Sequence, residues 1–267
     1  MKRIEIALLA LVMVFSCVAC GTTTTDEAEK PSASVEGSTE ESTAPSTSGT
    51  EEVTVMTYEQ FVAAAIDTKV CVETYVQAKQ GWWDNQATIY TQDKEGGYFL
   101  YNMPMSEEEY NKLTPGTKIK VSGHKTAWAG EVEIIDATYE IQEGSYVAAA
   151  MDATALLGTE ELINHQNKFV AFNGLTVEAS TDANGNEAAF LYNWDGSGEA
   201  GTDSDLYFNA SVNGSTYTFV VEYYLCNETT AAYQAVQGLN IGDTIDLEGF
   251  LYWYEGAQPH VTSVIVK

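Results

Sequence analysis

The chain has 267 residues and carries 39 acidic side chains against 12 lysines and arginines, so its formal net charge at pH 7 is −27. Binding of nucleic acid depends largely on Lys and Arg side chains that neutralise phosphates, and the charge therefore predicts that nucleic acid is not a partner. Of the four cysteines, two lie in the first twenty residues, so a disulfide framework is not expected and stability has to come from hydrophobic cores.

The N-terminus has the layout of a secretory signal. Two basic residues precede an apolar run over residues 6–15, which is too short to span a bilayer as a stable helix, and small residues then lead to Cys20. This segment resembles the signal of bacterial lipoproteins, which signal peptidase II cuts before a cysteine that carries lipid. The resemblance implies a signal peptide over residues 1–19, lipidation of Cys20 with Cys17 as the second candidate, and a membrane-anchored protein on the extracytoplasmic face of the cell membrane.

Residues 20–53 are predicted to form a lipid-anchored, disordered linker. The segment is rich in Ser, Thr, Glu, Pro and Gly and has few apolar side chains from which a packed core could form. A flexible chain of this length has an r.m.s. end-to-end distance of roughly 30 Å. We expect it to act as a tether that holds the following domains clear of the lipid headgroups.

The rest of the chain contains an internal repeat. The stretch GTKIKVSGHKTAW at residues 116–128 and the stretch GDTIDLEGFLYW at residues 242–253 follow the same rule. Each has a glycine, an alternating strand, a second glycine seven residues later and then a tryptophan. An internal duplication of this kind predicts two structural units in tandem.

The first copy predicts a specific order of elements. In chain order these are a helix at 57–66, strands at 69–79, 86–92 and 97–103, a helix at 106–113, and strands at 117–124 and 130–140. Three strands, a helix and two strands follow the order of the OB-fold, a small Greek-key barrel, and the pattern resembles that fold. The sequence therefore predicts a mainly β protein with two tandem OB-fold-like five-stranded barrels, each with a short helix, at residues 54–145 and 146–267.

The second copy differs by an inserted acidic loop at residues 180–204, within which a hairpin is expected around DANGN. After the insertion, Asn213 and Gly214 suit a two-residue hairpin turn. The insertion and the residue after it offer oxygen ligands of the kind that calcium binds, so a weak metal site is one interpretation and a solvated acidic loop is the other. The candidate ligands are Asp195, Glu199, Asp203 and Asp205. No other cofactor is expected.

The sequence lacks the usual patterns of catalysis. Its three histidines are His124, His165 and His260, and none is accompanied by a serine or cysteine in a recognisable nucleophile turn. No glycine-rich phosphate loop with its lysine is present either. We therefore expect a protein that is not an enzyme.

The placement of the five tryptophans suggests a function. They fall in the predicted loops with which OB-folds bind oligosaccharides, and aromatic faces stack on sugar rings. The predicted ligand-binding residues are Trp82, Trp83, Asp84, Asn85, Trp128, Trp194 and Trp253. The sequence thus predicts a non-catalytic cell-surface binding protein, with a glycan as the possible ligand. The alternative is a protein-interaction or spacer module of an envelope complex, in which the tryptophans only pack over the barrel ends.

Overall fold

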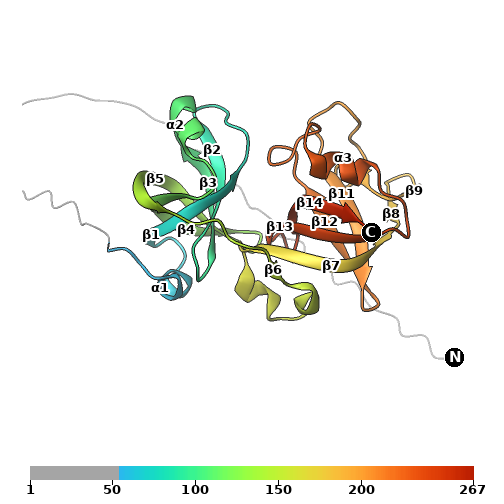
Figure 1. The fold of residues 1–267 in the computed structure, drawn as a ribbon, viewed down its shortest axis with the longest axis horizontal. Coiled ribbons are helices and arrows are strands. Elements are labelled where there is room, and N and C mark those ends of the chain that lie inside the picture. The colour runs from blue at the N-terminus through green and yellow to red at the C-terminus, as the bar shows by residue number, and fades with distance from the viewer. Residues whose placement is uncertain (1–53) are drawn as a thin grey trace, which may run out of the picture. The chain divides into compact units, whose positions relative to one another are not determined.

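The computed structural model describes residues 54–267 (Figure 1). These residues belong to one compact unit. The predicted signal peptide, both candidate lipidation sites and the predicted linker lie outside the described residues. Within the described part of the chain, no helix has the length and apolar character needed to cross a membrane.

The first barrel consists of β1 (Lys69–Lys79), β2 (Gln86–Gln92), β3 (Gly97–Pro104), β4 (Thr117–Trp128) and β5 (Glu131–Ser145). These strands close in the order β1-β2-β3-β5-β4, with β3 parallel to β5 and every other pair antiparallel. Helix α1 (Tyr58–Ala63) precedes β1, and helix α2 (Glu107–Lys112) connects β3 to β4. This arrangement confirms the predicted OB-fold-like barrel.

The second barrel consists of β7 (Phe169–Glu178), β11 (Leu206–Val212), β12 (Ser215–Val221), β13 (Thr244–Phe250) and β14 (His260–Val266). Strand β7 pairs with both β11 and β13, and β12 pairs in parallel with β14, so the five strands form the same closed circuit as the first barrel. Helix α3 (Ala231–Gln237) lies between β12 and β13, as α2 lies between β3 and β4. The structure therefore confirms two tandem five-stranded barrels.

Short elements fill the connections of the second barrel. They are β6 (Met151–Asp152), the 3-10 helices η1 (Thr154–Leu156) and η2 (Leu162–His165), β8 (Ser180–Thr181), β9 (Glu187–Ala188) and β10 (Leu191–Tyr192). Strands β8 and β9 pair with each other and form the expected hairpin within the insertion. At the tip of the β11–β12 hairpin, Asn213 and Gly214 have φ of 53° and 82°, as a two-residue turn of this type requires.

The glycines of the repeat have a structural cause. Gly116 and Gly242 occupy equivalent positions before β4 and β13, with φ of 91° and 93°, a region that favours glycine. Gly123 and Gly249 lie at irregularities in the register of the last strand pair of each barrel. A Cβ atom on Gly249 would lie 2.3 Å from the carbonyl oxygen of His260. Both copies therefore use a glycine where the strand bends to close the barrel.

Substitution of Gly249 by alanine is expected to lower the free energy of unfolding by about 1–3 kcal/mol, because the added methyl group overpacks against backbone. Chemical denaturation followed by circular dichroism measures the change. The control is Gly81→Ala, since a Cβ atom at position 81 would meet only the carbonyl oxygen of Tyr224, at 3.9 Å. Equal stability of the two variants would contradict this explanation of the repeat.

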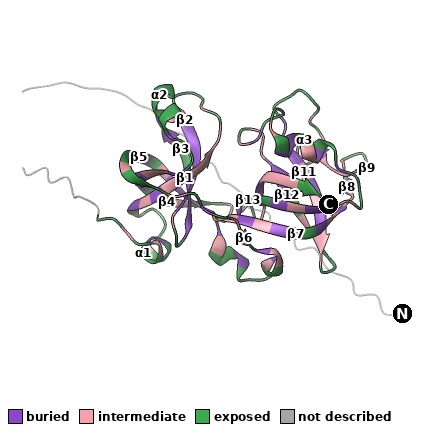
Figure 2. Cartoon of the chain, in the orientation of Figure 1, coloured by how far each residue is buried: buried purple, intermediate pink, exposed green. Residues whose placement is uncertain are grey.

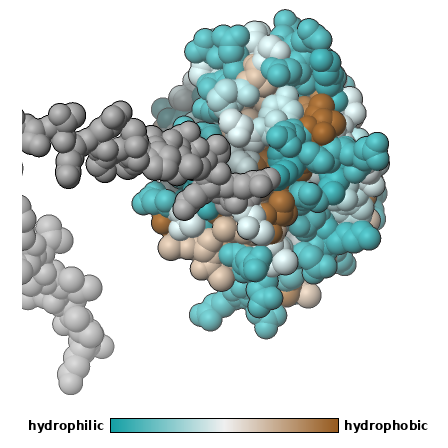
Figure 3. All heavy atoms as spheres, turned by 90° about the vertical axis from the view of Figure 1, so that its left-hand side faces the viewer, coloured by the Kyte–Doolittle hydropathy of each residue, from teal (hydrophilic) through white to brown (hydrophobic). Residues whose placement is uncertain are grey.

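Each barrel has its own hydrophobic core, and many of the buried residues lie on the strands (Figure 2). A third cluster joins the two barrels through Tyr90 and Phe99 of the first and Phe250 and Tyr252 of the second. Outside these cores the surface is mostly hydrophilic on the face drawn in Figure 3, where apolar patches are small and separate. The barrels therefore share a buried aromatic junction in addition to their own cores.

Candidate ligand-binding cleft

The β4–β5 turn, which follows Trp128, and the β13–β14 loop, which contains Trp253, lie against each other. The backbone N–H of Glu255, in the β13–β14 loop, donates to the carbonyl oxygen of Ala129 in the β4–β5 turn over 2.7 Å. The N–H of Trp253 donates to Oε2 of Glu131 over 2.9 Å. A Cβ atom on Gly130 would lie 2.8 Å from Cδ1 of Trp253, so this indole packs closely over the turn. Trp253 therefore contacts the first barrel as well as its own.

Beside this contact lies a cleft of about 710 Å³, which we name the aromatic cleft. Its lining residues are Gln80, Phe99, Tyr101, Trp128, Trp194, Asp205, Tyr207, Glu222, Tyr252, Tyr254, Gln258 and His260. A smaller hollow of about 300 Å³, which we name the Glu133 hollow, shares Tyr101, Trp128 and Tyr252 with it and adds Thr126, Ala127, Glu133 and Ile135. Binding sites for small molecules typically measure roughly 300–1,000 Å³, so the cleft has a suitable size.

The aromatic rings of the cleft come from both barrels. Trp128, at the end of β4, lies 5.1 Å from the ring of Tyr254 in the β13–β14 loop. Trp128 and Trp194 are 56% and 75% exposed, and Tyr101 on β3 is also exposed. Deeper in, the ring of Tyr252 stacks on His260 at 4.1 Å. The cleft therefore presents open ring faces above a packed aromatic floor.

The carboxyl groups of the cleft have no cationic partner among its lining residues. Burial raises the pKa of Glu222 to about 7, with a further contribution from the neighbouring charge of Asp205. Burial likewise raises the pKa of Asp205. In the Glu133 hollow, burial raises the pKa of Glu133 to about 7. Glu222 accepts from the backbone N–H groups of Tyr224 and Leu225, and Asp205 accepts from that of Tyr223. Lysine and arginine are absent from both linings, so none of the three carboxyls has a cationic partner there.

The floor of the cleft contains a neutral histidine. Nδ1 of His260 shares a 2.7 Å hydrogen bond with the hydroxyl of Tyr90, and Nε2 of Gln80 donates to the same hydroxyl over 3.4 Å. Burial lowers the pKa of His260 to about 3, so the imidazole is uncharged at neutral pH. Gln80, His260 and Gln258 thus add uncharged polar groups to the cleft.

Glu131 lies buried next to the cleft, at the junction of the barrels. Its Oε2 accepts from Trp253, whereas its Oε1 and the Oδ1 of the neighbouring Asn167 have no hydrogen-bond partner among the described residues. Burial raises the pKa of Glu131 to about 9, and the carboxyl is therefore protonated at neutral pH. Glu131 contributes a neutral acid to the junction.

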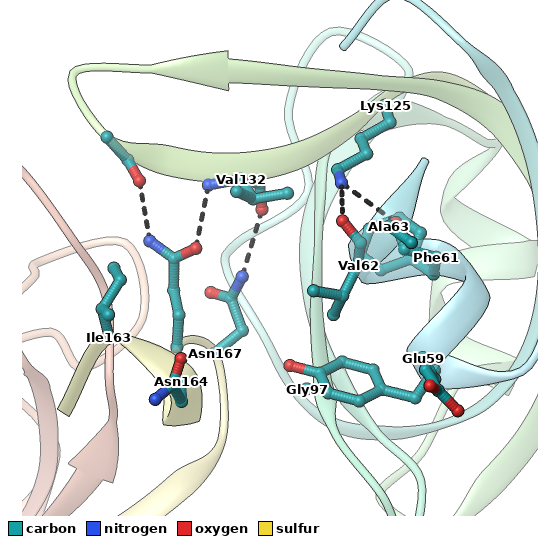
Figure 4. Close-up of a pocket in the computed structure, with 13 residues that line it drawn as sticks. Glu59, Phe61, Val62, Ala63, Gly97, Lys125, Val132, Ile163, Asn164 and Asn167 are labelled. Carbon is teal, nitrogen blue, oxygen red and sulfur yellow. Dashed lines mark hydrogen bonds between the residues drawn. The ribbon is translucent and has the colours of Figure 1, made fainter. Parts of the chain in front are cut away.

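A second cavity of about 670 Å³ lies beside α1 (Figure 4). The ammonium group of Lys125 donates to the carbonyl oxygens of Phe61, Val62 and Ala64 over 2.9, 2.8 and 2.8 Å, which holds the end of the helix. Other polar side chains of this cavity bind backbone: Gln166 bonds to Gly130 and Val132, and Asn167 bonds to Val132. Because these groups support the chain, the aromatic cleft is the stronger candidate site.

The structure brings together only some of the predicted site residues. Trp128 and Trp194 both line the aromatic cleft. Trp82 is half-buried, and its Nε1 donates to the carbonyl oxygen of Met105 over 2.9 Å. Trp83 pairs with Gln86 across a tight turn. The middle residues of this turn are Asp84 and Asn85, with φ of 44° and 59°.

None of the predicted residues 82–85 lines either of the two large cavities or the Glu133 hollow. These four residues thus lie outside the three cavities, and the N–H of Trp82 is bonded inside the first barrel. Trp128 also differs from the prediction in its position, since it ends strand β4 and does not lie in a loop. Trp253 is partly buried against the core of the second barrel.

The suggested calcium ligands are not gathered into a site. Between residues 54 and 267 no group of three or more His, Cys, Asp or Glu side chains is placed to hold a metal ion. Asp195 accepts from the backbone N–H of Ser197 within its own turn, and Asp205 lines the aromatic cleft. Within the described residues, the carboxylates therefore do not form a common metal site. They belong to Asp195, Glu199, Asp203 and Asp205.

Several residues of the aromatic cleft and of the Glu133 hollow were not predicted from the sequence. They are Gln80, Phe99, Tyr101, Glu133, Tyr207, Glu222, Tyr252, Tyr254 and Gln258. One usable signal was the density of aromatic residues in LYWYEG at residues 251–256. Another was the presence of glutamates at 131 and 133, which alternate with the apolar residues Val132 and Ile134 at the start of a strand. Neither signal indicates which loops meet in space.

The sequence matches no protein-family model and no curated protein. Among solved structures, a murine DNA-binding protein bound with double-stranded DNA is 12% identical, with a TM-score of 0.33, over 74% of this chain and 97% of that one. The Ifi202 HINa domain in complex with 20-bp double-stranded DNA is 10% identical, with a TM-score of 0.34, over 75% and 98%. Aspartyl tRNA synthetase from Entamoeba histolytica is 15% identical, with a TM-score of 0.32, over 43% of this chain and 28% of the synthetase.

These comparisons correct one prediction. The exclusion of nucleic acid as a partner is wrong as stated, because similar structures include domains bound to double-stranded DNA. Net charge bears on association and solubility and does not by itself decide what a barrel of this kind binds. At these identities and TM-scores the likeness transfers no ligand to this chain.

Proposed function

We propose that this chain is a non-catalytic, lipid-anchored protein of the cell surface that binds an oligosaccharide in the aromatic cleft. The observation that supports the proposal is the pairing of open ring faces with polar groups in one cavity. The C–H faces of sugar rings pack on aromatic rings, and their hydroxyls need donors and acceptors nearby. OB-folds bind oligosaccharides through the loop between their last two strands, which here supplies Tyr252, Tyr254 and Gln258.

The polar groups suit a ligand with many hydroxyls. Asp205 and Glu222 offer acceptors, whereas the side-chain amides of Gln80 and Gln258 offer both donors and acceptors. Trp128 and Trp194, from different barrels, offer ring faces. A sugar chain lying between them would contact both barrels at once, which favours a ligand longer than one ring.

A glycan array probed with the full-length protein tests this proposal. The protein is kept in a detergent without a sugar headgroup, so that the detergent does not compete for the cleft. Binding should be displaced by the free oligosaccharide and should change the tryptophan fluorescence. Oligonucleotides are titrated in parallel, because aromatic rings also stack on bases. Tighter binding of an oligonucleotide would replace the proposal, and the absence of any glycan ligand would favour a protein-interaction or spacer module.

The lipid anchor gives a separate prediction. Cys20→Ala is expected to release the protein from the membrane fraction or to stall its processing, because the lipid-bearing side chain is lost. Cys17→Ala is the control and should leave the protein membrane-bound. Fractionation followed by immunoblotting measures both variants. Full membrane retention of the Cys20 variant, or release of the Cys17 variant instead, would contradict the assignment of Cys20.

A further inference from the structure

Glu133 is a buried acid without a partner in the protein. It lies on β5, is 6% exposed and lines the Glu133 hollow. Between residues 54 and 267, its carboxylate makes no hydrogen bond or ion pair with another side chain, and burial alone accounts for its raised pKa. Burial of an ionised carboxylate without a partner is strongly unfavourable. A buried acid that faces a cavity in this way points to a group supplied from outside.

Three aromatic side chains surround the same hollow. Tyr101, Trp128 and Tyr252 line it together with Glu133, and they also line the aromatic cleft. The charge of Glu133 is felt at the buried phenol of Tyr252, where burial, the Glu131 carboxyl and then Glu133 raise the pKa. The faces of aromatic rings attract cations, and rings grouped with an acid are typical of sites for ammonium groups.

We infer that the Glu133 hollow binds an ammonium group of the ligand, so that the oligosaccharide in the aromatic cleft carries an amine. This inference rests on the proposed function, because the cleft beside the hollow would hold the sugar rings. Three observations carry it: the buried Glu133 side chain without a side-chain partner, the three aromatic rings that line the same hollow, and the absence of lysine and arginine from both linings. A neutral sugar would leave Glu133 without a partner, whereas an ammonium group provides one.

The test compares two oligosaccharides that differ only at nitrogen: a glucosamine oligomer with free amines and the same oligomer fully N-acetylated. Both are titrated near neutral pH against the full-length protein and its Glu133→Gln variant. Calorimetry gives the two dissociation constants. The wild type should bind the amine form about tenfold more tightly or better, because ring faces and a carboxylate both favour the cation. The variant should lose this preference and retain its affinity for the acetylated form.

The control is Glu140→Gln, an exposed glutamate on the same strand, which should change neither constant. Unchanged affinity of Glu133→Gln for the acetylated oligomer shows that the variant is folded. Equal binding of both oligomers by the wild type would overturn the inference and leave the proposed function standing. Binding of neither oligomer, nor of any other glycan on the array, would overturn both.

Choline chloride distinguishes the source of the ammonium group. If choline binds to the wild type and Glu133→Gln weakens it about tenfold, the hollow recognises an ammonium group whatever carries it, which supports the inference. If choline does not bind but the glucosamine oligomer keeps its preference, the ammonium group is recognised on the sugar itself, which also supports it. Choline binding that is unaffected by Glu133→Gln would place the cation elsewhere and overturn the assignment to Glu133.

Discussion

Replacement of Trp128 by alanine is expected to weaken oligosaccharide binding by roughly 1–3 kcal/mol, by analogy with the stacking of bases on aromatic side chains. Trp128 lines both the aromatic cleft and the Glu133 hollow, and its ring lies against Tyr254 of the other barrel. Because the side chain is more than half exposed, its removal should change the free energy of unfolding by only about 0.5 kcal/mol. Calorimetric titration and chemical denaturation of the same preparations measure the two effects.

Trp83→Ala is the matched control for this result. Trp83 is 55% exposed, close to the exposure of Trp128, but it lies on the β1–β2 turn and lines none of the cavities described above. Its substitution should leave the affinity unchanged. Loss of binding in the Trp83 variant together with normal binding in the Trp128 variant would return the site to the 82–85 turn that the sequence suggested.

The wild-type protein is expected to lose stability as the pH rises above neutral, and Glu131→Gln is expected to remove much of this loss. Burial raises the pKa of Glu131 to about 9 in the folded protein. An exposed glutamate in the unfolded chain titrates near 4.3, so the folded state binds more protons between these values. The contribution of Glu131 to stability is therefore fully present below about pH 4.3 and is lost as the pH rises through about 9. The pKa values of Glu133 and Glu222 are also raised, to about 7, so their contributions to stability are likewise lost as the pH rises through about 7.

Glutamine at position 131 keeps the shape of the protonated acid and carries no charge at any pH. It can still accept from the N–H of Trp253, and its amide can donate to the unpartnered oxygen of Asn167. At about pH 9 the variant should be more stable than the wild type by about 1–3 kcal/mol, the usual cost of an unsatisfied buried polar group. Urea denaturation across this pH range measures it, with the exposed Glu143→Gln as the control. Parallel pH profiles of wild type and Glu131→Gln would show that this carboxyl is not protonated at the junction.

Most of the fold was predictable because its determinants are local. The strands predicted at 69–79 and 86–92 lie where the structure has them, and the glycines of the repeat marked the bends that close each barrel. The duplication then supplied the second barrel. Turn signals such as Asn213 and Gly214 act over two residues and were equally readable.

The candidate site was less predictable because it is built where two barrels meet. Trp128 and Trp194 are predicted ligand-binding residues that line the aromatic cleft, but nothing in the order of residues shows that a β4 residue lies beside Tyr254, which is 126 positions later in the chain. Trp82 looked equivalent to Trp128 in sequence, yet its N–H is bonded to Met105 within the barrel. Burial of Glu133 is likewise a result of tertiary packing, which periodicity does not reveal.

The central claim is that the aromatic cleft between the barrels is the binding site for a sugar chain. A crystal structure of the protein with the tightest oligosaccharide from the array tests it most directly. We expect sugar rings against Trp128 and Tyr254, with an amine, if the ligand has one, next to Glu133. Sugar bound at the 82–85 turn or elsewhere on the surface, with the aromatic cleft empty, would contradict it.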